Sequence, residues 1–370
     1  MNDSPQRTDR GAPAGVRKAR SVGSISAFFL LIALLGNAQA QSGATYVTET
    51  EFTVVADFDG DGRTDTALVD RRTGSIRVAY QTSPGAHAWY PTRATGLRDV
   101  SGVSAGRLLA LGHDTLVVTA PDANRLLLVD LPATTTPAIP REVFVPGIGP
   151  TYSAAVNLPG PGNTGFDDLV TASLLNGAKP QRIARTRNQD GATFSPIDEV
   201  TPEPVLLGLQ RLARTAFLPG YTVTYREGTR SRVEVFDASA APVSLAWNVT
   251  NLPPAGDHFI ATFTAGSNRH VISWEPGHTE LGFAALVNAV PTVDAGSTIT
   301  TLDVSIDRVR LIEQPGGPPL VLVTSATLPG AALLQFDGTN SWTTLASLPA
   351  PESGAFTTAC LLYTSDAADE

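Results

Sequence analysis

The residues best suited to chemistry are four aspartates in the segment DFDGDGRTD, at positions 57, 59, 61 and 65. Two glycines, Gly60 and Gly62, permit the sharp backbone path that turns alternate carboxylates toward the inside of a tight loop. The residue between the last two aspartates, Arg63, can offer its backbone carbonyl. Hard oxygen ligands in this number suit Ca²⁺, and suit the smaller and stricter Mg²⁺ less well.

The residues after this loop decide which kind of calcium loop it can be. An EF-hand places a bidentate glutamate at the twelfth position, where this sequence has Leu68, and continues as a helix. Here the loop is followed by TALVD, a strand pattern, so an EF-hand is excluded. Two other interpretations stay open, a solvated acidic turn without metal and a catalytic metal site. Four unpaired aspartates would repel one another, and saturating carboxylates leave no position for substrate, so we favour a structural ion.

The pattern of strand, D-x-D-G-D-x-x-x-D and buried strand resembles the FG-GAP/VCBS repeat of integrin-like β-propellers. The resemblance implies a structural Ca²⁺ between two strands of a blade, and it implies the ligands Asp57, Asp59, Asp61, the Arg63 carbonyl and Asp65. A worn copy, NLPGPGNTGFDDLV, begins at Asn157. Prolines replace its later carboxylates, and Asp167 and Asp168 precede its strand, so we do not expect this copy to bind metal.

The elements that must position this loop repeat about every fifty residues. Short apolar runs, which we interpret as the first strand of each unit, are centred on Leu68, Leu116, Leu169, Val223, Val271 and Val321. They lie 48, 53, 54, 48 and 50 residues apart. With about four short strands a unit and no helical stripe, this period predicts an all-β propeller of six to seven blades over residues 41–359. Two unrelated β-sandwiches are the alternative fold. Trp89, Trp247 and Trp342 are expected to pack between neighbouring sheets.

The two ends of the chain are interpreted as separate from this fold. Residues 1–40 carry a basic stretch, an apolar run and small residues, the order of a signal peptide cut before Gln41, with an uncleaved anchor as the alternative. Residues 360–370, CLLYTSDAADE, resemble a translated sequencing adapter, so we expect the natural protein to continue differently. The only cysteine, Cys360, lies in that tail, so no disulfide is expected, as fits an exported bacterial protein.

Other candidate catalytic groups give weaker signals. The five histidines form no zinc motif; His258, His270 and His278 lie in one unit near Glu275 and Glu280, and are interpreted as surface or turn residues. The GHDT segment could form a dyad, but it lies where the second unit would have its loop. A carboxylate pair for glycoside cleavage is spatial and stays open. The arginine-rich segment 181–190 is interpreted as a solvated blade edge.

Composition and motif together predict a function class. The net charge of −9 argues against nucleic acid and anionic membrane as partners, and no membrane span is expected after residue 40. We expect a secreted or cell-surface, non-catalytic module for recognition, adhesion or scaffolding, with a protein or glycan ligand on the loop face of the propeller. Two alternatives stay open: a propeller lyase or hydrolase acting on extracellular polysaccharide, and an export-associated domain of a large repeat-containing toxin.

Overall fold

The chain divides into two units, Met1–Ala44 and Thr45–Glu370, and every residue described below belongs to the second. The structure is a computed structural model that describes residues 50–83, 86–121, 125–133, 140–143, 149–174, 181–212, 219–253, 259–265, 268–286, 293–295, 298–312, 320–325, 330–336 and 342–349. The predicted signal peptide and the predicted adapter-derived tail lie outside these residues.

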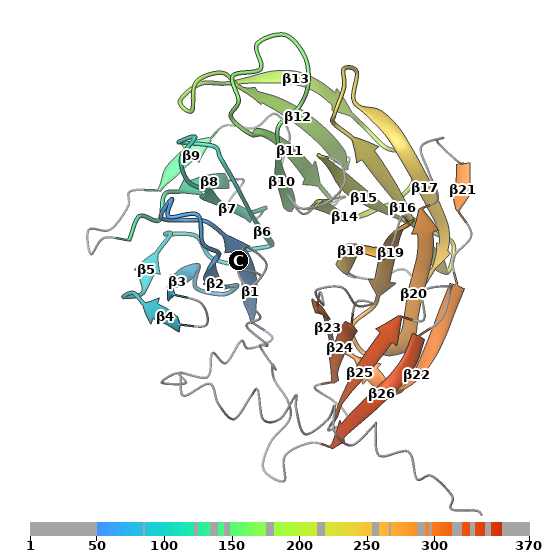
Figure 1. Cartoon of the computed structure of the whole chain (residues 1–370). Helices are drawn as coiled ribbons and strands as arrows, with labels where there is room; N and C mark the ends of the chain where they lie inside the picture. The colour runs from blue at the N-terminus through green and yellow to red at the C-terminus, as the bar shows by residue number, and fades with distance from the viewer. Residues whose placement is uncertain are drawn as a thin grey trace, which may run out of the picture. The chain divides into compact units, whose positions relative to one another are not determined.

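The described residues form strands and loops, and the strands group into six sheets that follow one another in chain order (Figure 1). Blade 1 contains β1 (Glu51–Ala56), β2 (Asp65–Asp70), β3 (Ser75–Ser83), β4 (Ala86–Trp89) and β5 (Arg93–Ala94). Blade 2 contains β6 (Gly102–Gly106), β7 (Thr115–Ala120), β8 (Arg125–Val129) and β9 (Arg141–Val143). Blade 3 contains β10 (Tyr152–Val156), β11 (Asp168–Ser173), β12 (Arg182–Asn188) and β13 (Phe194–Val200).

The second half of the chain repeats the arrangement. Blade 4 contains β14 (Leu206–Arg211), β15 (Gly220–Glu227), β16 (Arg230–Asp237) and β17 (Ser244–Leu252), joined by β21 (Val293–Ala295). Blade 5 contains β18 (Phe259–Ala265), β19 (Asn268–Trp274), β20 (His278–Leu286) and β22 (Thr298–Ile306). Blade 6 contains β23 (Arg308–Ile312), β24 (Leu320–Ser325), β25 (Gly330–Phe336) and β26 (Trp342–Pro349).

Each sheet is a four-stranded antiparallel meander made from one unit of the repeat. The exceptions are added strands: β5 pairs with β3, and β21 pairs in parallel with β17 although it lies between β20 and β22 in sequence. The predicted six- to seven-bladed β-propeller is confirmed with six blades, and no seventh blade is needed. The β-sandwich alternative is wrong, because sequential strands fill one small sheet before the chain moves to the next.

Apolar cores lie between successive blades, and strand alternation supplies both sides of each core. All six residues of β7 are buried. Leu116 and Val118 belong to the core shared with blade 1, while Val117 between them belongs to the core shared with blade 3. Similar clusters join blades 3 and 4, 4 and 5, and 5 and 6. Each fully buried aliphatic side chain stabilises such a core by about 1.5–3 kcal/mol.

The tryptophan prediction is correct for two of its three residues. Trp247 belongs to the core between blades 4 and 5, and Trp342 packs edge-on against Phe283, 5.9 Å between ring centroids, between blades 5 and 6. Trp89 is 40% exposed, so the prediction is wrong there. It ends the four-residue strand β4, and the guanidinium carbon of Arg77 lies 5.9 Å from its ring centroid.

The apolar runs that marked each repeat are the second strands of the blades and not the first. The first strands β1, β6 and β10 contact one another along the series, and the sequences of β6 and β10, GVSAG and YSAAV, are dominated by small residues. Crowding between neighbouring first strands favours small side chains, which weakens their hydrophobic pattern in the sequence.

Within the described residues no helix reaches the length and hydropathy of a membrane span.

Candidate metal centre

The acidic loop connects β1 to β2, the place that the sequence pattern predicted. Its two ends are fixed by the ladder, in which Ala56 pairs with Asp65. Gly60 and Gly62 have φ angles of 81° and 85°, a backbone conformation that side chains other than glycine rarely adopt. A Cβ on Gly60 would also lie 3.0 Å from the Gly112 carbonyl of the adjacent blade. Both glycines are therefore needed for the path of this loop.

Three of the predicted ligands converge at one point. Asp57, Asp59 and Asp61 can each contribute a carboxylate oxygen to a group whose members all lie within 4.8 Å of one another. Asp57 and Asp59 are half-buried, and Asp61 is exposed. Three hard oxygen donors at this separation fit Ca²⁺, and Mg²⁺ would need stricter octahedral geometry.

Backbone amides hold these carboxylates in place. Asp57 accepts from the Gly60 and Gly62 amides at 2.8 and 3.1 Å, and Asp61 accepts from the Arg63 amide at 2.8 Å. Burial raises the pKa of Asp59, and the charges of Asp61 and Asp57 raise it further against the effect of the Asp61 amide, which lowers it. The carboxylates thus converge at a cost in mutual repulsion, which a bound cation would relieve.

The fourth aspartate, Asp65, anchors the base of the loop. Its side chain is fully buried; one oxygen accepts from the Phe58 amide and the other from the Gln81 amide in β3, both at 2.9 Å. Burial raises the pKa of Asp65 to about 6, although those two amides lower it. Asp65 therefore ties the loop to β3, a role of its own beside the predicted ligation.

Arg63 crosses the outer side of the loop. Its Nε donates to the Gln81 carbonyl at 2.8 Å, and its guanidinium forms an ion pair with Asp61. This second contact to Gln81 holds the loop against β3 from the solvent side. Ligation through the Arg63 carbonyl and through Asp65 stays a prediction from the loop pattern.

Two hydrogen bonds between blades 1 and 2, which the sequence pattern does not predict, connect the acidic loop to its neighbour. The Asp114 amide donates to the Asp57 carbonyl at 2.6 Å, and the Asp57 amide donates to the Asp114 carboxylate at 3.2 Å. Blades 2 and 3 repeat it: Asp167 exchanges the same two bonds with Arg107, each at 2.9 Å. We call each reciprocal pair an inter-blade latch. Its sequence signal is an aspartate just before a second strand, at 114 and again at 167.

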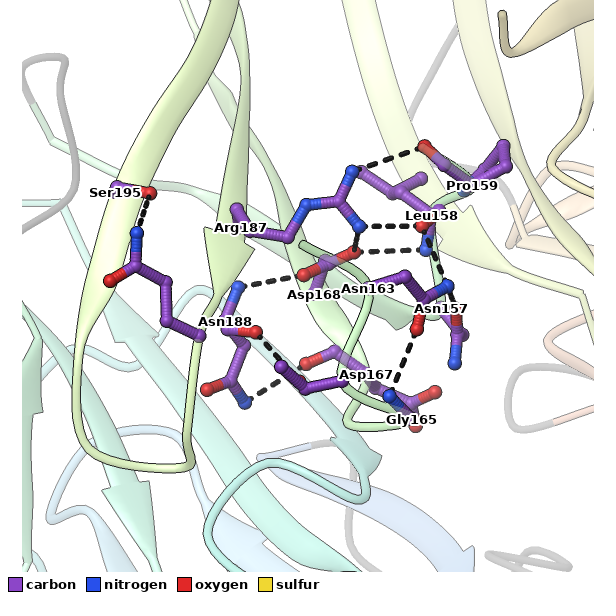
Figure 2. Close-up of polar contacts among 12 residues, drawn as sticks. Asn157, Leu158, Pro159, Asn163, Gly165, Asp167, Asp168, Arg187, Asn188 and Ser195 are labelled. Atoms are coloured by element: carbon purple, nitrogen blue, oxygen red, sulfur yellow. Dashed lines mark hydrogen bonds and ion pairs between the residues drawn. The ribbon is translucent and has the colours of Figure 1, made fainter. Parts of the chain in front are cut away.

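The worn loop of blade 3 occupies the same structural position as the acidic loop. Val156 pairs with Asp168 as Ala56 pairs with Asp65, so Asn157 lies where Asp57 does, as predicted. The Pro159 carbonyl accepts from Arg187 Nη2 at 3.0 Å, and the Asn163 side-chain amide donates to Asn157 Oδ1 (Figure 2). Within this described loop no three carboxylates converge as they do in blade 1.

The arginines of segment 181–190 are paired with acids and do not form a solvated edge throughout. Arg182 pairs with Glu199 and Arg185 with Asp198, both across β12 and β13. Arg187 is directed inward and is only 9% exposed, so the solvated-edge interpretation is wrong for this residue. Arg185 and Arg187 are two positions apart and lie on one face of β12. Arg187 differs because it lies beside Asp168 at the loop end of the strand, a contact that the sequence alone does not show.

The histidine candidates are partly described. His113 Nε2 lies 2.7 Å from Oδ1 of Asp130, the residue that follows β8. The partner of this histidine is therefore outside the GHDT segment and is not the adjacent Asp114. His278 lies 3.4 Å from Glu275, and Glu280 pairs with Arg230 at 2.6 Å. His258 and the side chain of His270 lie outside the described parts. Glu275 and Glu280 thus have separate partners.

The comparisons with known proteins show the fold and nothing finer. No protein-family model matches the chain, and no curated protein matches it. A chain in the crystal structure of BBS1N in complex with ARL6DN, soaked with lead, is similar over 84% of each chain, at 12% identity and a TM-score of 0.50. A protein from Lactobacillus plantarum is similar over 81% of this chain and 85% of its own, at 14% identity and a TM-score of 0.50.

A third similar structure is a lectin from Agrocybe aegerita that recognises non-reducing terminal N-acetylglucosamine, at 15% identity and a TM-score of 0.47 over 83% of each chain. At these identities the first two similarities show a shared fold alone. The fold that the blades and these comparisons establish is a six-bladed, all-β propeller.

Proposed function

We propose that this protein is an exported, calcium-stabilised β-propeller of the FG-GAP/VCBS type, acting as a non-catalytic recognition, adhesion or scaffold module. The observation that supports it most is the convergence of Asp57, Asp59 and Asp61 in a β1–β2 loop of a propeller blade. Carboxylates held this close by their own loop amides form a preorganised set of hard ligands.

Calcium at this point would stabilise more than its own loop. The latch between Asp57 and Asp114 links the loop directly to the entry of β7. Ordering Asp57 therefore orders the contact between blades 1 and 2 as well. We propose a structural role for the ion, since its ligands come from one loop and serve the junction of two blades.

The proposed ligand is a protein or a glycan bound by the loops of the propeller. Fold alone does not specify a ligand, so this part of the proposal is an analogy. The similar structure of BBS1N is a complex with ARL6DN, which illustrates a protein partner for a chain of this architecture. The net charge of −9 disfavours nucleic acid as that partner.

Export rests on the charged, apolar and small-residue order of residues 1–40. It is tested by expressing the chain in a bacterial host, fractionating the cells and measuring the mass of the product. We expect an exported product beginning at Gln41. A full-length product retained in the cytoplasm would contradict export without bearing on calcium.

The calcium part is tested by thermal unfolding of the purified protein in a chelator, followed by addition of Ca²⁺ or Mg²⁺. We expect the chelator to lower the unfolding midpoint, Ca²⁺ to restore it and Mg²⁺ to restore it less. Asp99→Asn, an exposed aspartate away from the loop, serves as the control and should respond like wild type. An unfolding midpoint unaffected by chelator and by Ca²⁺ would contradict the proposal.

The recognition part is tested by incubating the protein with glycan arrays and with extracellular polysaccharides. Binding without chain cleavage supports a recognition module. Release of shortened or unsaturated sugar products would instead identify a polysaccharide hydrolase or lyase, and the non-catalytic proposal would then be wrong.

A further inference from the structure

The loops of blades 1 and 3 share one anchoring scheme. In blade 1 the buried Asp65 accepts from the Phe58 and Gln81 amides, both at 2.9 Å. In blade 3 the buried Asp168 accepts from the Leu158 amide at 3.0 Å and from the Asn188 amide at 2.7 Å. Phe58 and Leu158 each follow the first loop residue, and each is buried. The two loops are therefore built on the same frame.

The interior of the blade 3 loop is filled by a cation that belongs to the chain. Arg187 Nη1 donates to the Leu158 carbonyl at 2.6 Å and to Asp168 Oδ2 at 2.9 Å, and its Nη2 donates to the Pro159 carbonyl at 3.0 Å. Figure 2 shows the guanidinium directed at these three oxygens. Two carbonyls and a carboxylate around one positive group are the kinds of ligand that a calcium loop uses.

Blade 1 has no such group at the equivalent position. Asn188 and Gln81 supply the matching amides, so Arg187 corresponds to Tyr80 in β3. Tyr80 packs in the core between blades 1 and 2 and donates its hydroxyl to the Leu131 carbonyl at 2.7 Å. Three carboxylates converge in the blade 1 loop, whereas the two carboxylates at the end of the blade 3 loop are each paired with a guanidinium, Asp167 with Arg211 and Asp168 with Arg187.

The remaining residues of the blade 3 loop are adapted to this arrangement. Gly160 has a φ of 125°, and a Cβ there would lie 3.3 Å from Arg187 Nη2, so glycine leaves room for the guanidinium. Asn157 replaces the first aspartate and accepts from the Asn163 side-chain amide. The Asn163 side chain also caps the Gly165 amide at 2.9 Å. An amide and two prolines thus stand in this loop where blade 1 has its three converging aspartates.

We propose that Arg187 is an internal cation that takes the place of calcium in blade 3, so that this loop is held closed without any ion. The statement that blade 1 takes calcium rests on the proposed function, but the role of Arg187 does not. Blade 3 is then independent of calcium, and the chain has one calcium loop and one arginine loop on the same frame.

The test compares Arg187→Met, Arg187→Lys and a matched control, Arg185→Met, in a chelator and in Ca²⁺. Arg185 lies on the same strand and pairs with Asp198, away from the loop. For Arg187→Met we expect the unfolding midpoint to fall by roughly 5–10 °C in both buffers, because a buried ion pair loses one partner. Arg187→Lys should lose less, because it keeps the charge, and Arg185→Met should also lose less.

Amide hydrogen exchange distinguishes a local opening of the blade 3 loop from a general loss of stability. In wild type with chelator, the Leu158 and Asn188 amides should be protected, and in Arg187→Met they should exchange faster than amides of β15 and β16. Arg187→Lys serves this measurement if the Met variant does not fold. Arg185→Met should leave the Leu158 amide protected.

An unchanged midpoint and unchanged Leu158 exchange in Arg187→Met would overturn the proposal. Recovery of the lost stability of Arg187→Met by Ca²⁺, beyond the gain seen in wild type, would support it, because the ion would then occupy the position that the guanidinium holds in wild type. A wild type that gains nothing from Ca²⁺ would contradict the blade 1 proposal alone, while a loss in Arg187→Met in chelator would still support the internal cation.

Discussion

Individual carboxylates in the blade 1 loop have different tasks, although the sequence presents them as one alternating set. Asp57, Asp59 and Asp61 converge near the solvent, and Asp65 lies fully buried with both oxygens accepting backbone amides. The difference follows from strand position, because Asp65 is the first residue of β2 and its side chain points into the sheet packing. Burial raises the pKa of a carboxylate so placed.

Asp65 predicts a pH dependence of the metal-free protein. Its folded pKa of about 6 lies above the ordinary value of 3.8, so the folded state retains this proton where the unfolded state releases it. The contribution to stability is therefore complete below about pH 4 and is lost as the pH rises through about 6. Asp65→Asn should lessen this fall in the unfolding free energy, measured by urea denaturation in chelator between about pH 4 and 7.

Asp70 provides the control for this measurement. Amides of Thr73 and Arg72 in an exposed turn lower the pKa of Asp70, so its stabilising effect is lost only below the ordinary aspartate range. Asp70→Asn should leave the slope between about pH 4 and 7 close to that of wild type. Equal slopes in wild type and Asp65→Asn would show that Asp65 does not titrate as described.

At the scale of strands and loops, the latches connect one blade to the next. Asp114 and Asp167 each exchange two hydrogen bonds with the first loop residue of the preceding blade. Both aspartates are buried, so removing the carboxylate leaves a backbone amide without its partner. Junctions between blades therefore depend on polar contacts as well as on the apolar cores.

Asp114→Ala should lower the unfolding free energy by about 1–3 kcal/mol, since the Asp57 amide loses its acceptor. Asp114→Asn keeps an acceptor oxygen and should cost less. Chemical denaturation measures both, and amide exchange at Asp57 locates the effect at the latch. An Asp114→Ala protein with wild-type stability and wild-type exchange at Asp57 would rule out a stabilising latch.

Gly106, at the end of β6, lies where blades 2 and 3 approach each other closely. A Cβ there would lie 2.5 Å from Ala155 Cβ and 2.6 Å from Asp167 Oδ2, so Gly106→Ala forces the blades apart. We expect a loss of about 1–3 kcal/mol in unfolding free energy, as for other overpacked sites. Gly112→Ala is the matched control, because nothing lies within 4 Å of its Cβ position. Equal stabilities of the two variants would contradict the close approach.

The sequence predicted the repeat and the acidic loop because both depend on local pattern. The second strands are continuous apolar runs such as TLVVTA, and the aspartates alternate within nine residues. The first strands were harder to recognise because small residues such as those of β6 carry little hydrophobic signal. The contacts of Arg187 and Asp114 join residues 19 to 57 positions apart, and the sequence shows which residues exist but not which of them meet.

The whole propeller combines apolar cores between blades with loops closed in two ways. Five clusters join the six blades in series, and the loops of blades 1 and 3 lie on the same frame with different charges inside. We propose that the acidic loop takes a cation from solution, whereas the blade 3 loop contains Arg187. On this proposal the described part of the molecule combines one ion-dependent blade with a blade whose loop is held by its own arginine.

Titration calorimetry of the full chain with Ca²⁺, compared with the Asp59→Asn/Asp61→Asn double variant, measures this directly. Wild type should bind about one ion per chain through its cluster of three carboxylates. The double variant removes two of those carboxylates and should show no saturable binding while it keeps the unfolding midpoint that wild type has in chelator. Absence of binding to wild type, or equal binding to both proteins, would contradict a calcium site formed by Asp57, Asp59 and Asp61.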